Sequence, residues 1–326
     1  MLISNPIIRS RNKHLDDLVD EWSLIDPQGI GLTGAAIGDA MIVRRLMRFL
    51  KKQKIDKIVF NTAQGGHVRN ACLFSLFRKV EFVGIIHTIR KFKESFTQKV
   101  INLKVKKYFV LAEFLEEQIP PKKGIKFETF YPIDFPKGTE NFEKNDQLHI
   151  SIIGSVEVRR KDLQGFVSLV QQTNAAVQFN FLGKADPKNL DVIKLKEELI
   201  KLGYIDRVMF YEKHIDLDEI DRILRKTDAI LPLIHPETPS SDQYFRNQIP
   251  GSMNVALAYN IPLLLHEHFE NIGELNAASC YYEINQFSNA VDLLTKQASS
   301  IKNNMISIET YSSSFNQEQY VNFLLS

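Results

Sequence analysis

Residues 250–252 read Pro-Gly-Ser directly before an apolar segment, and their types suit the binding of a phosphate. The first turn of a helix has backbone N–H groups without intrahelical acceptors and carries about half a positive charge. Glycine at Gly251 would let a phosphate approach the backbone closely, and the hydroxyl of Ser252 would add a donor. Proline at Pro250 costs little stability, because the backbone N–H that it lacks would have had no acceptor at this position. A loop followed by an ordinary helix start is the alternative interpretation.

Three basic residues, Arg159, Arg160 and Lys161, follow the apolar segment 147–154 in the same half of the chain. The planar guanidinium of arginine matches the oxygens of a phosphate, and charged donors make stronger hydrogen bonds than neutral ones. We expect one of the two arginines and Lys161 to bind an anionic ligand. An exposed basic loop without a ligand is the alternative.

The first half of the chain has candidates of its own. Gly65 and Gly66 stand between a predicted strand and a predicted helix, which fits the close approach of a sugar or phosphate, although a tight turn would use the same residues. His87 ends the next predicted strand, and histidine suits a general base because its pKa lies near working pH. A histidine of the core or of a helix cap is the alternative. His67 and Asp39 are weaker candidates for the base.

Alternating strands and helices must position these residues. Near-continuous apolar strands separated by segments of helical periodicity are typical of parallel sheets covered on both faces. In the second half the predicted strands are 147–154, 177–183, 207–212, 228–234, 261–267 and 280–284, and the helices are 161–173, 189–203, 216–227, 251–260 and 287–300. In the first half the strands are 56–62, 81–88, 108–113 and 125–134, and the helices are 39–53, 65–79, 96–106 and 113–119.

The pattern predicts an α/β protein with two Rossmann-like, doubly wound parallel-sheet domains that face a central cleft. The N-terminal domain is expected at residues 1–140 and the C-terminal domain at residues 146–312, with a polar linker around 135–146. A length of 326 residues suits two domains of ~150 residues each.

The charge is unevenly distributed along the chain. Residues 1–145 hold 25 Lys and Arg against 16 Asp and Glu, or +9, and the rest hold 16 against 23, or −7, which gives the net +2. Residues 44–107 alone hold 17 basic and 3 acidic residues. Such a segment favours an anionic partner, either nucleic acid, an acidic membrane surface or a phosphorylated substrate; a solvated face without a partner is the alternative.

Several other classes of protein are disfavoured. The sequence has no apolar run of the ~18 residues that a membrane-spanning helix needs. Cys72 and Cys280, the only cysteines, form no disulfide framework, so we expect a reducing cytoplasm. No glycine fingerprint of a nicotinamide enzyme follows a first strand, and Asp and His residues show no metal-ligand spacing.

The order of elements in residues 148–295 resembles the nucleotide-sugar-binding domain of GT-B glycosyltransferases of the group 1, or family 4-like, type. "ISIIGSVEVRRKDLQGF" is similar to the strand, basic loop and helix of that family, and "VQFNFLGKA" to its next strand. "RVMFYEKHIDLDEIDRILRKTDAILPLI" resembles the closely spaced strand, helix and Asp-led strand that follow. "GSMNVALAYNIPLLL" resembles its helix of small residues and the strand entered through proline. The first half resembles a shortened acceptor domain more weakly.

This resemblance implies that the C-terminal domain binds a nucleotide-diphosphate sugar. Arg160 and Lys161 would stabilise the charge of the leaving diphosphate, and His87 would contact the sugar or act as base. Gly65, Gly66 and His67 would lie on the acceptor side. The residues expected around the donor are Gly154, Arg159, Gly183, Lys184, Lys213, His214, Gly251, Ser252 and Met253. His214 could equally be a surface residue.

The sequence departs from the retaining branch of this family in one place. That branch has two glutamates eight positions apart around the phosphate cradle, and this chain has Asn247 and Val255 there. The carboxylate that binds the ribose is therefore missing, and the stereochemical outcome stays open. Polar contacts to the donor would have to come from Tyr244, Arg246, Asn247 and Gln248.

We therefore expect a metal-independent glycosyltransferase without a cofactor, which transfers a sugar to a hydroxyl of a glycan or lipid-linked acceptor. A non-catalytic nucleotide-sugar-binding protein and a sugar-nucleotide epimerase of the same fold are alternatives. A nucleic-acid binder is disfavoured, because the basic cluster lacks a recognisable motif. We expect a cytoplasmic protein whose residues 44–107 rest on the inner face of an anionic membrane, and a terminal helix, 313–326, that packs back on the first domain as in the family.

Overall fold

The computed structural model describes residues 2–4, 22–24, 36–132 and 147–326. It divides into two compact units, Met1–Phe109 with Pro121–Phe127, and Val110–Pro120 with Glu128–Ser326. The predicted linker around 135–146 lies outside the described residues, as does the predicted boundary near residue 140. The two short strands β1 (Leu2–Ser4) and β2 (Trp22–Leu24) pair in parallel.

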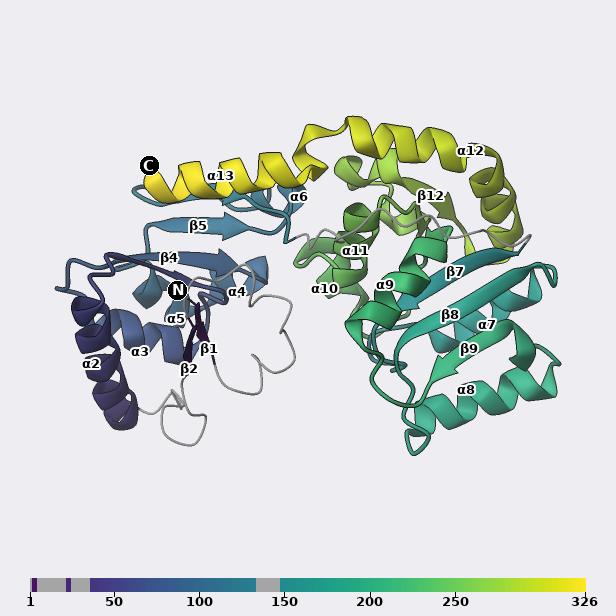
Figure 1. The fold of residues 1–326 in the computed structure, drawn as a ribbon, viewed down its shortest axis with the longest axis horizontal. Coiled ribbons are helices and arrows are strands. Elements are labelled where there is room, and N and C mark those ends of the chain that lie inside the picture. The colour runs from purple at the N-terminus through teal and green to yellow at the C-terminus, as the bar shows by residue number, and fades with distance from the viewer. Residues whose placement is uncertain (1, 5–21, 25–35, 133–146) are drawn as a thin grey trace. The chain divides into compact units, whose positions relative to one another are not determined.

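The first larger sheet has four strands in the order β3-β4-β5-β6 (Figure 1). Its strands β3 and β4 pair in parallel from Lys57↔Glu81 to Phe60↔Gly84. The strands of this sheet are β3 (Lys57–Phe60), β4 (Glu81–Ile86), β5 (Lys107–Val110) and β6 (Lys126–Thr129). The helices are α2 (Ala36–Lys52), α3 (Gly66–Phe74), α4 (Ile89–Glu94), α5 (Phe96–Ile101) and α6 (Glu113–Glu116).

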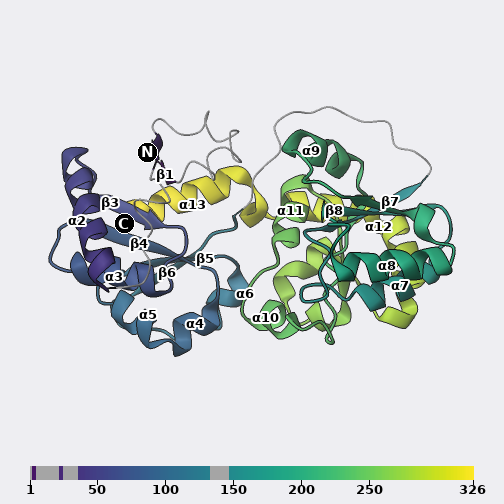
Figure 2. The ribbon, with the colours of Figure 1, turned by 90° about the horizontal axis from the view of Figure 1, so that it is seen from below.

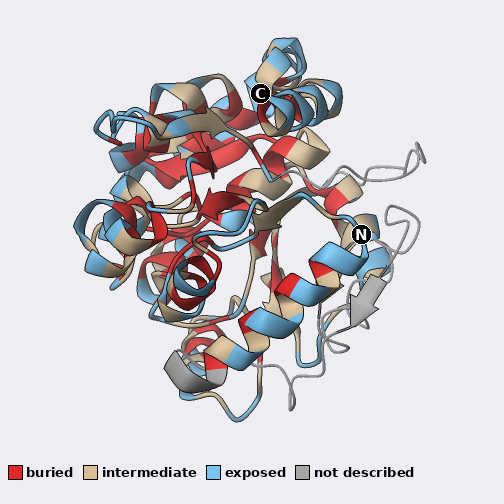
Figure 3. Cartoon of the chain, turned by 90° about the vertical axis from the view of Figure 1, so that its left-hand side faces the viewer, coloured by how far each residue is buried: buried red, intermediate tan, exposed pale blue. Residues whose placement is uncertain are grey.

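Helices α2, α3 and α5 form a layer on this sheet. Strands in sequential order with right-handed crossovers place their connecting helices on the same face. Accordingly α2 packs against α3 and α3 against α5, as Figures 1 and 2 show. Helix α2 is amphipathic, with Val43, Met47 and Leu50 buried. Its exposed residues are mostly arginine and lysine, and Figure 3 shows this exposed side in pale blue toward the viewer.

Two helices of this layer end earlier than the sequence indicated. Helix α3 stops at Phe74, because the hydroxyl of Ser75 donates to the carbonyl of Ala71 at 2.5 Å and competes with the helical pattern. Turns then carry the chain through Phe77 and Arg78. Similarly, the helix predicted over 96–106 ends at Ile101.

The second unit is built on a six-stranded sheet in the order β12-β11-β10-β7-β8-β9, and all of its neighbouring strands pair in parallel. The chain begins in the middle at β7, moves outward to β9, returns to β10 beside β7, and moves outward again. This reversal is the doubly wound arrangement predicted from the sequence. The strands are β7 (Leu148–Ile153), β8 (Val177–Lys184), β9 (Val208–Tyr211), β10 (Ala229–Ile230), β11 (Leu263–His266) and β12 (Ser279–Tyr282).

Helices cover both faces of the second sheet. The hand of the crossovers puts α7 and α8, which pack together, on one face and α11 on the other, over β7 and β10. Phe166 of α7 meets Phe179 and Phe181 of β8 edge-on at 5.2 and 5.0 Å, and all three rings are fully buried. The helices are α7 (Leu163–Gln171), α8 (Leu190–Lys201), α9 (Leu217–Lys226), α10 (Ser241–Arg246), α11 (Gly251–Tyr259), α12 (Phe287–Ser307) and α13 (Ser313–Leu325).

The terminal helix α13 contacts the residues that directly follow β6. The side chain of Asn316 accepts a hydrogen bond from the N–H of Tyr131 at 3.1 Å, and Tyr320 packs on Phe130 at 5.2 Å between ring centroids. The prediction that this helix packs back on the first domain stays a prediction, because these contacts lie within the second unit.

Gly84 in β4 permits a close approach that a larger residue would prevent. A Cβ atom at Gly84 would lie 2.3 Å from the Cβ of Ala63 and 2.9 Å from the ring of Tyr108. We expect Gly84→Ala to lower the free energy of unfolding by about 1–3 kcal/mol through overpacking. Urea unfolding measures the change. Gly273→Ala is the control, because nothing lies within 4 Å of its added Cβ; an equal loss in both variants would refute the packing argument.

Candidate functional site

The candidate site lies at the carboxyl edge of the second sheet, where the strand order reverses between β7 and β10. Open parallel sheets bind ligands at this position, because the loops that leave the two middle strands run in opposite directions and leave a crevice. The loop after β7 carries the basic residues 159–161. The segment after β10 leads to α10 and α11.

Helix α11 begins at Gly251, and Pro250 precedes it with φ −65° and no side-chain cap. The N–H of Met253 donates to the carbonyl of Pro250 at 3.0 Å. Among the hydrogen bonds of the described residues, none uses the N–H of Gly251 or Ser252. The side chain of Met253 is fully buried, so only its backbone could face a ligand. The helix start therefore has two backbone donors that an anion could use, and the anion site itself stays a prediction.

Lys161 is buried at the end of β7. Its ammonium donates to the carbonyl of Ile153 at 2.9 Å, and its side chain lies against Gly154, whose φ is +97°. Burial lowers the pKa of Lys161 to about 8, and the nearby charge of Arg160 adds to that effect, while Glu157 opposes it. A buried cation whose hydrogen-bond acceptor is a neutral carbonyl is costly unless an anion joins it.

The two arginines of this loop are exposed. Arg159 and Arg160 lie 3.7 and 3.9 Å from the carboxylate of Glu157. Exposed ion pairs of this kind contribute little stability, so either guanidinium is free to move toward an anion. The structure thus separates the predicted trio into one fixed buried amine and two exposed guanidinium groups.

Gly183 has a packing role. A Cβ atom at Gly183 would lie 2.4 Å from the backbone of Gly154, so β8 passes the end of β7 this closely only because residue 183 is glycine. Lys184 pairs with Asp186 at 2.7 Å on the surface. These residues lie at the predicted edge, and the packing explains Gly183 without a ligand.

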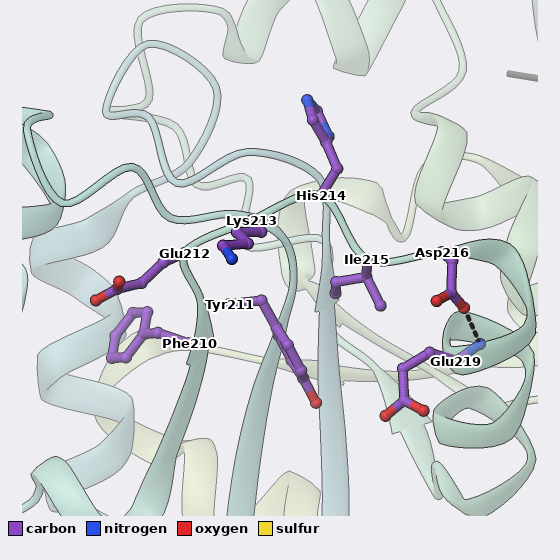
Figure 4. Close-up of a pocket in the computed structure, with 8 residues that line it drawn as sticks. All are labelled: Phe210, Tyr211, Glu212, Lys213, His214, Ile215, Asp216 and Glu219. Carbon is purple, nitrogen blue, oxygen red and sulfur yellow. Dashed lines mark hydrogen bonds between the residues drawn. The ribbon is translucent and has the colours of Figure 1, made fainter.

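A hollow of about 410 Å³ follows β9 and contains Lys213 and His214 (Figure 4). Asp216 also lines this hollow. It caps α9, where its carboxylate accepts a hydrogen bond from the N–H of Glu219 at 2.8 Å. In Figure 4 the ring of His214 points away from Tyr211 and Glu219. The hollow has room for part of a ligand, with Lys213 and His214 in its wall.

The residues expected to replace the missing glutamates lie in and after α10, a short helix that the sequence did not indicate. Arg246 pairs with Asp242 at 3.4 Å, and both line a second hollow of about 460 Å³ with His268. Tyr244 is in the same helix, while Asn247 and Gln248 follow it. The side chain of Gln248 is hydrogen-bonded to that of Gln243.

The first sheet presents its own candidates at its carboxyl edge. Gly65, with φ +92°, is the cap of α3, which begins at Gly66, and His67 is exposed. His87 follows β4, and its Nε2 is hydrogen-bonded to the carbonyl of Asn61. A carbonyl only accepts, so Nε2 carries the proton. The lone pair of a neutral His87 is then on Nδ1, as a general base needs.

Asp39, one of the two weaker base candidates, has a structural role. It is fully buried in α2, and its carboxylate accepts a hydrogen bond from the amide of Asn70 in α3 at 2.6 Å. Its burial and this hydrogen bond give no support to Asp39 as a base that contacts a substrate.

No protein-family model matches the sequence, and no curated protein is similar to it. Solved structures are similar over nearly the whole chain. A glycosyltransferase from Rickettsia africae ESF-5 is 11% identical with a TM-score of 0.68, and the match covers 95% of this chain and 86% of that one. A putative UDP-N-acetylglucosamine 2-epimerase from Listeria monocytogenes is 12% identical with a TM-score of 0.61, and the match covers 96% of this chain and 85% of that one. The UDP-GlcNAc 2-epimerase from Neisseria meningitidis bound to UDP-GlcNAc is 12% identical with a TM-score of 0.61, and the match covers 99% of this chain and 90% of that one.

The chain has the GT-B fold. The predicted fold class, two parallel sheets in Rossmann-like units, is confirmed. At these identities the likeness concerns the fold, and the site residues stay predictions.

A buried chain of hydrogen bonds, which sequence reasoning missed, supports the basic loop of this GT-B site. His235 follows β10 and is fully buried. Its Nδ1 lies 2.8 Å from the carboxylate of Asp162, and its Nε2 lies 2.8 Å from the hydroxyl of Tyr282. Asp162 also caps α7 by accepting the N–H of Gly165 at 2.8 Å. The chain thus joins β12, the loop after β10 and the start of α7.

The protonation of this chain follows from its partners. Burial alone would raise the pKa of Asp162, but the hydrogen bonds from His235 and Gly165 outweigh it and hold the pKa below its usual value. Burial raises the pKa of Tyr282 far above its usual value, so its hydroxyl stays protonated and donates. Because the Tyr282 hydroxyl donates and the Asp162 carboxylate accepts, His235 accepts at Nε2 and donates from Nδ1. Both nitrogens are used, so His235 positions the loops and does not exchange protons with a substrate.

Three consecutive residues, His266, Glu267 and His268, have ligand atoms within 4.8 Å of one another. Burial and the neighbouring His235 lower the pKa of His266 to about 4, so its ring is neutral. However, its Nδ1 accepts the N–H of His268 at 3.2 Å, so Nε2 carries the proton and no lone pair is free. This geometry gives no support to a metal site, and metal independence stays a prediction.

We expect Tyr282→Phe to lower the free energy of unfolding by about 1–3 kcal/mol, because Nε2 of His235 would be buried without a donor. Chemical denaturation measures this change. Tyr281→Phe is the matched control, since its hydroxyl bonds Asn276 at an exposed position and its loss should change stability by less than about 0.5 kcal/mol. Equal effects of the two substitutions would contradict the role given to the buried chain.

Lys161→Met should stabilise the protein at pH 7 by about 1–3 kcal/mol, because it removes a buried charge. The pKa of Lys161 falls from 10.5 to about 8 on folding, so the folded state binds fewer protons between these values. Wild-type stability therefore rises with pH in that interval, and the advantage of the variant should shrink. Denaturation midpoints of both proteins between pH 7 and 10 measure this difference in stability. Lys184→Met, at a half-buried lysine whose ammonium pairs with Asp186, should show no such trend.

Proposed function

We propose that the protein is a glycosyltransferase, which transfers a sugar from a nucleotide-diphosphate donor to a hydroxyl of a glycan or lipid-linked acceptor. The observation that carries the proposal is the uncapped start of α11 at Gly251 together with buried Lys161, at the same edge of one doubly wound sheet. In the part of the chain that the structure describes, no carboxylate is hydrogen-bonded to either feature, and an anion would stabilise both.

The chemistry follows from where charge develops in the reaction. As the bond between the sugar and the diphosphate breaks, negative charge grows on the leaving diphosphate. The N–H groups of Gly251 and Ser252, the ammonium of Lys161, and Arg159 or Arg160 would stabilise that charge from fixed or nearby positions. This donor set does the work of a metal ion. His87, with its lone pair on Nδ1, would take the proton of the acceptor hydroxyl.

Two alternatives have specific support. A sugar-nucleotide epimerase is favoured by the similar structures, two of which are 2-epimerases. A non-catalytic nucleotide-sugar-binding protein is favoured by Asn247 and Val255, which stand where the retaining branch has glutamates. Conversion of a free donor without an acceptor would identify the epimerase, and donor binding without sugar release would identify the binding protein.

The location of the protein is part of the same proposal. No helix of the described residues is long and apolar enough to cross a bilayer. We propose a cytoplasmic protein that associates peripherally with an anionic membrane surface through residues 44–107, where a lipid-linked acceptor would be presented.

A panel of UDP-, GDP-, ADP-, CMP- and dTDP-sugars should identify the donor by thermal shift. A ligand at 100 times its Kd stabilises the folded state by about 2.7 kcal/mol, so one nucleotide should raise the Tm. Gly251→Asp should abolish the shift, because a carboxylate at the helix start repels the diphosphate. The same carboxylate stabilises the helix, so the variant should fold.

Gly251→Asn is the matched control for this experiment, since it has the same size without the charge. Nothing lies within 4 Å of a Cβ at this position, so neither side chain disturbs the packing. We expect Asn to weaken the shift much less than Asp. The donor-site assignment would be overturned by a shift that both variants retain, or by no shift with any nucleotide.

A further inference from the structure

The end of α3 and the turn after it expose large apolar side chains. Phe77 is 97% exposed, Leu73 is 45% exposed and Phe74 is 43% exposed. They lie within five residues, and α3 ends at Phe74. Leu103, which is 57% exposed, follows α5. We refer to these four side chains as the apolar ridge.

Two contacts place the parts of the apolar ridge side by side. Helix α3 packs against α5, and both views of the fold show them as neighbours (Figures 1 and 2). The ammonium of Lys104, next to Leu103, donates to the carbonyl of Arg78, next to Phe77, at 2.6 Å. The two turns that carry the ridge are thus tied directly together.

Basic residues surround the apolar ridge. Arg78 and Lys79 directly follow Phe77 and are exposed, and Lys99 is exposed on α5. Of the three acidic residues in 44–107, Glu81 pairs with Lys57 and Lys107, and Glu94 pairs with Arg90. Acidic partners are therefore few in this segment, and the net positive charge stays on the surface.

A bilayer with anionic lipids fits this combination better than the other anionic partners. Base stacking uses aromatic rings, whereas Leu73 and Leu103 are aliphatic and suit hydrocarbon. Protein interfaces are depleted in lysine around their apolar core, whereas this ridge is bordered by Lys79, Lys99 and Lys104. Lysine and arginine at an anionic leaflet are favourable, and apolar side chains below them enter the acyl boundary.

We propose that the apolar ridge inserts into the interface of an anionic membrane, with Arg78 and Lys79 at the level of the lipid headgroups. This inference rests on the membrane part of the proposed function and adds that hydrophobic insertion, and not charge alone, holds the protein there. Two signals are needed for stable attachment, because neither a few charges nor one apolar group suffices.

Binding of the full chain to vesicles of phosphatidylcholine with phosphatidylglycerol tests the proposal. We expect Phe77→Ser to weaken binding by about tenfold, from the loss of a buried aromatic side chain. Leu103→Ser should weaken it by a smaller factor. Phe96→Ser is the matched control, because Phe96 is 76% exposed at the opposite end of α5 from Leu103, and its loss should leave binding unchanged. Wild-type protein should still bind the vesicles at high salt, although more weakly, because salt screens the charges and leaves the hydrophobic contribution.

The outcomes separate the ridge from the rest of the proposal. Wild-type binding that Phe77→Ser leaves unchanged and that salt abolishes would overturn insertion and leave charge-driven attachment. No binding to anionic vesicles, or equal binding to phosphatidylcholine alone, would overturn the membrane partner. The thermal shift with a nucleotide-sugar should be the same in wild type and Phe77→Ser, so a failure of the donor site is recognised independently.

Discussion

One carboxylate holds together the part of the molecule on which the candidate site depends. Asp162 binds the ring of His235 at 2.8 Å, and its N–H donates to the carbonyl of Leu233 at 3.0 Å. These contacts join the loops that leave β7 and β10, beyond the last ladder hydrogen bonds of the two strands. At a reversal of strand order the loops diverge, so the sheet alone does not fix them. The tie to His235, and through it to Tyr282, supplies that constraint.

The same tie accounts for the burial of Lys161. Its neighbour Asp162 is fixed by α7 and His235, so the amine is directed back toward the end of β7, where the carbonyl of Ile153 accepts its hydrogen bond. The ionised Asp162 uses its oxygens on His235 and on the N–H of Gly165, so it does not neutralise the lysine. The fold therefore keeps a cation at the edge of the sheet, and the carboxylate next to it in sequence is used elsewhere. That arrangement costs stability and suits the binding of a negatively charged ligand.

The sequence allowed both sheets and the doubly wound order to be predicted, because apolar strands alternate with helices of regular periodicity. It also located Lys161 and the start of α11, since these depend on residues close in sequence. The contacts of His235 span 73 residues to Asp162 and 47 to Tyr282, and no local pattern signals them. Helix α10 was missed because its six residues are mostly polar. The exposure of the apolar ridge was not predicted, because Phe74 and Phe77 fit a longer helix, which Ser75 interrupts.

The glycines of the site show how structural and functional demands can be separated. Gly154 has a left-handed backbone, and Gly183 has no room for a Cβ, so folding alone accounts for both. Gly251 has neither property: its φ is not positive, and nothing lies within 4 Å of an added Cβ. Glycine at a helix start increases the entropy lost on folding and gains no packing. The open space above its backbone would give a phosphate access to the first N–H groups of α11. Folding does not require glycine at Gly251, and the proposed donor site would.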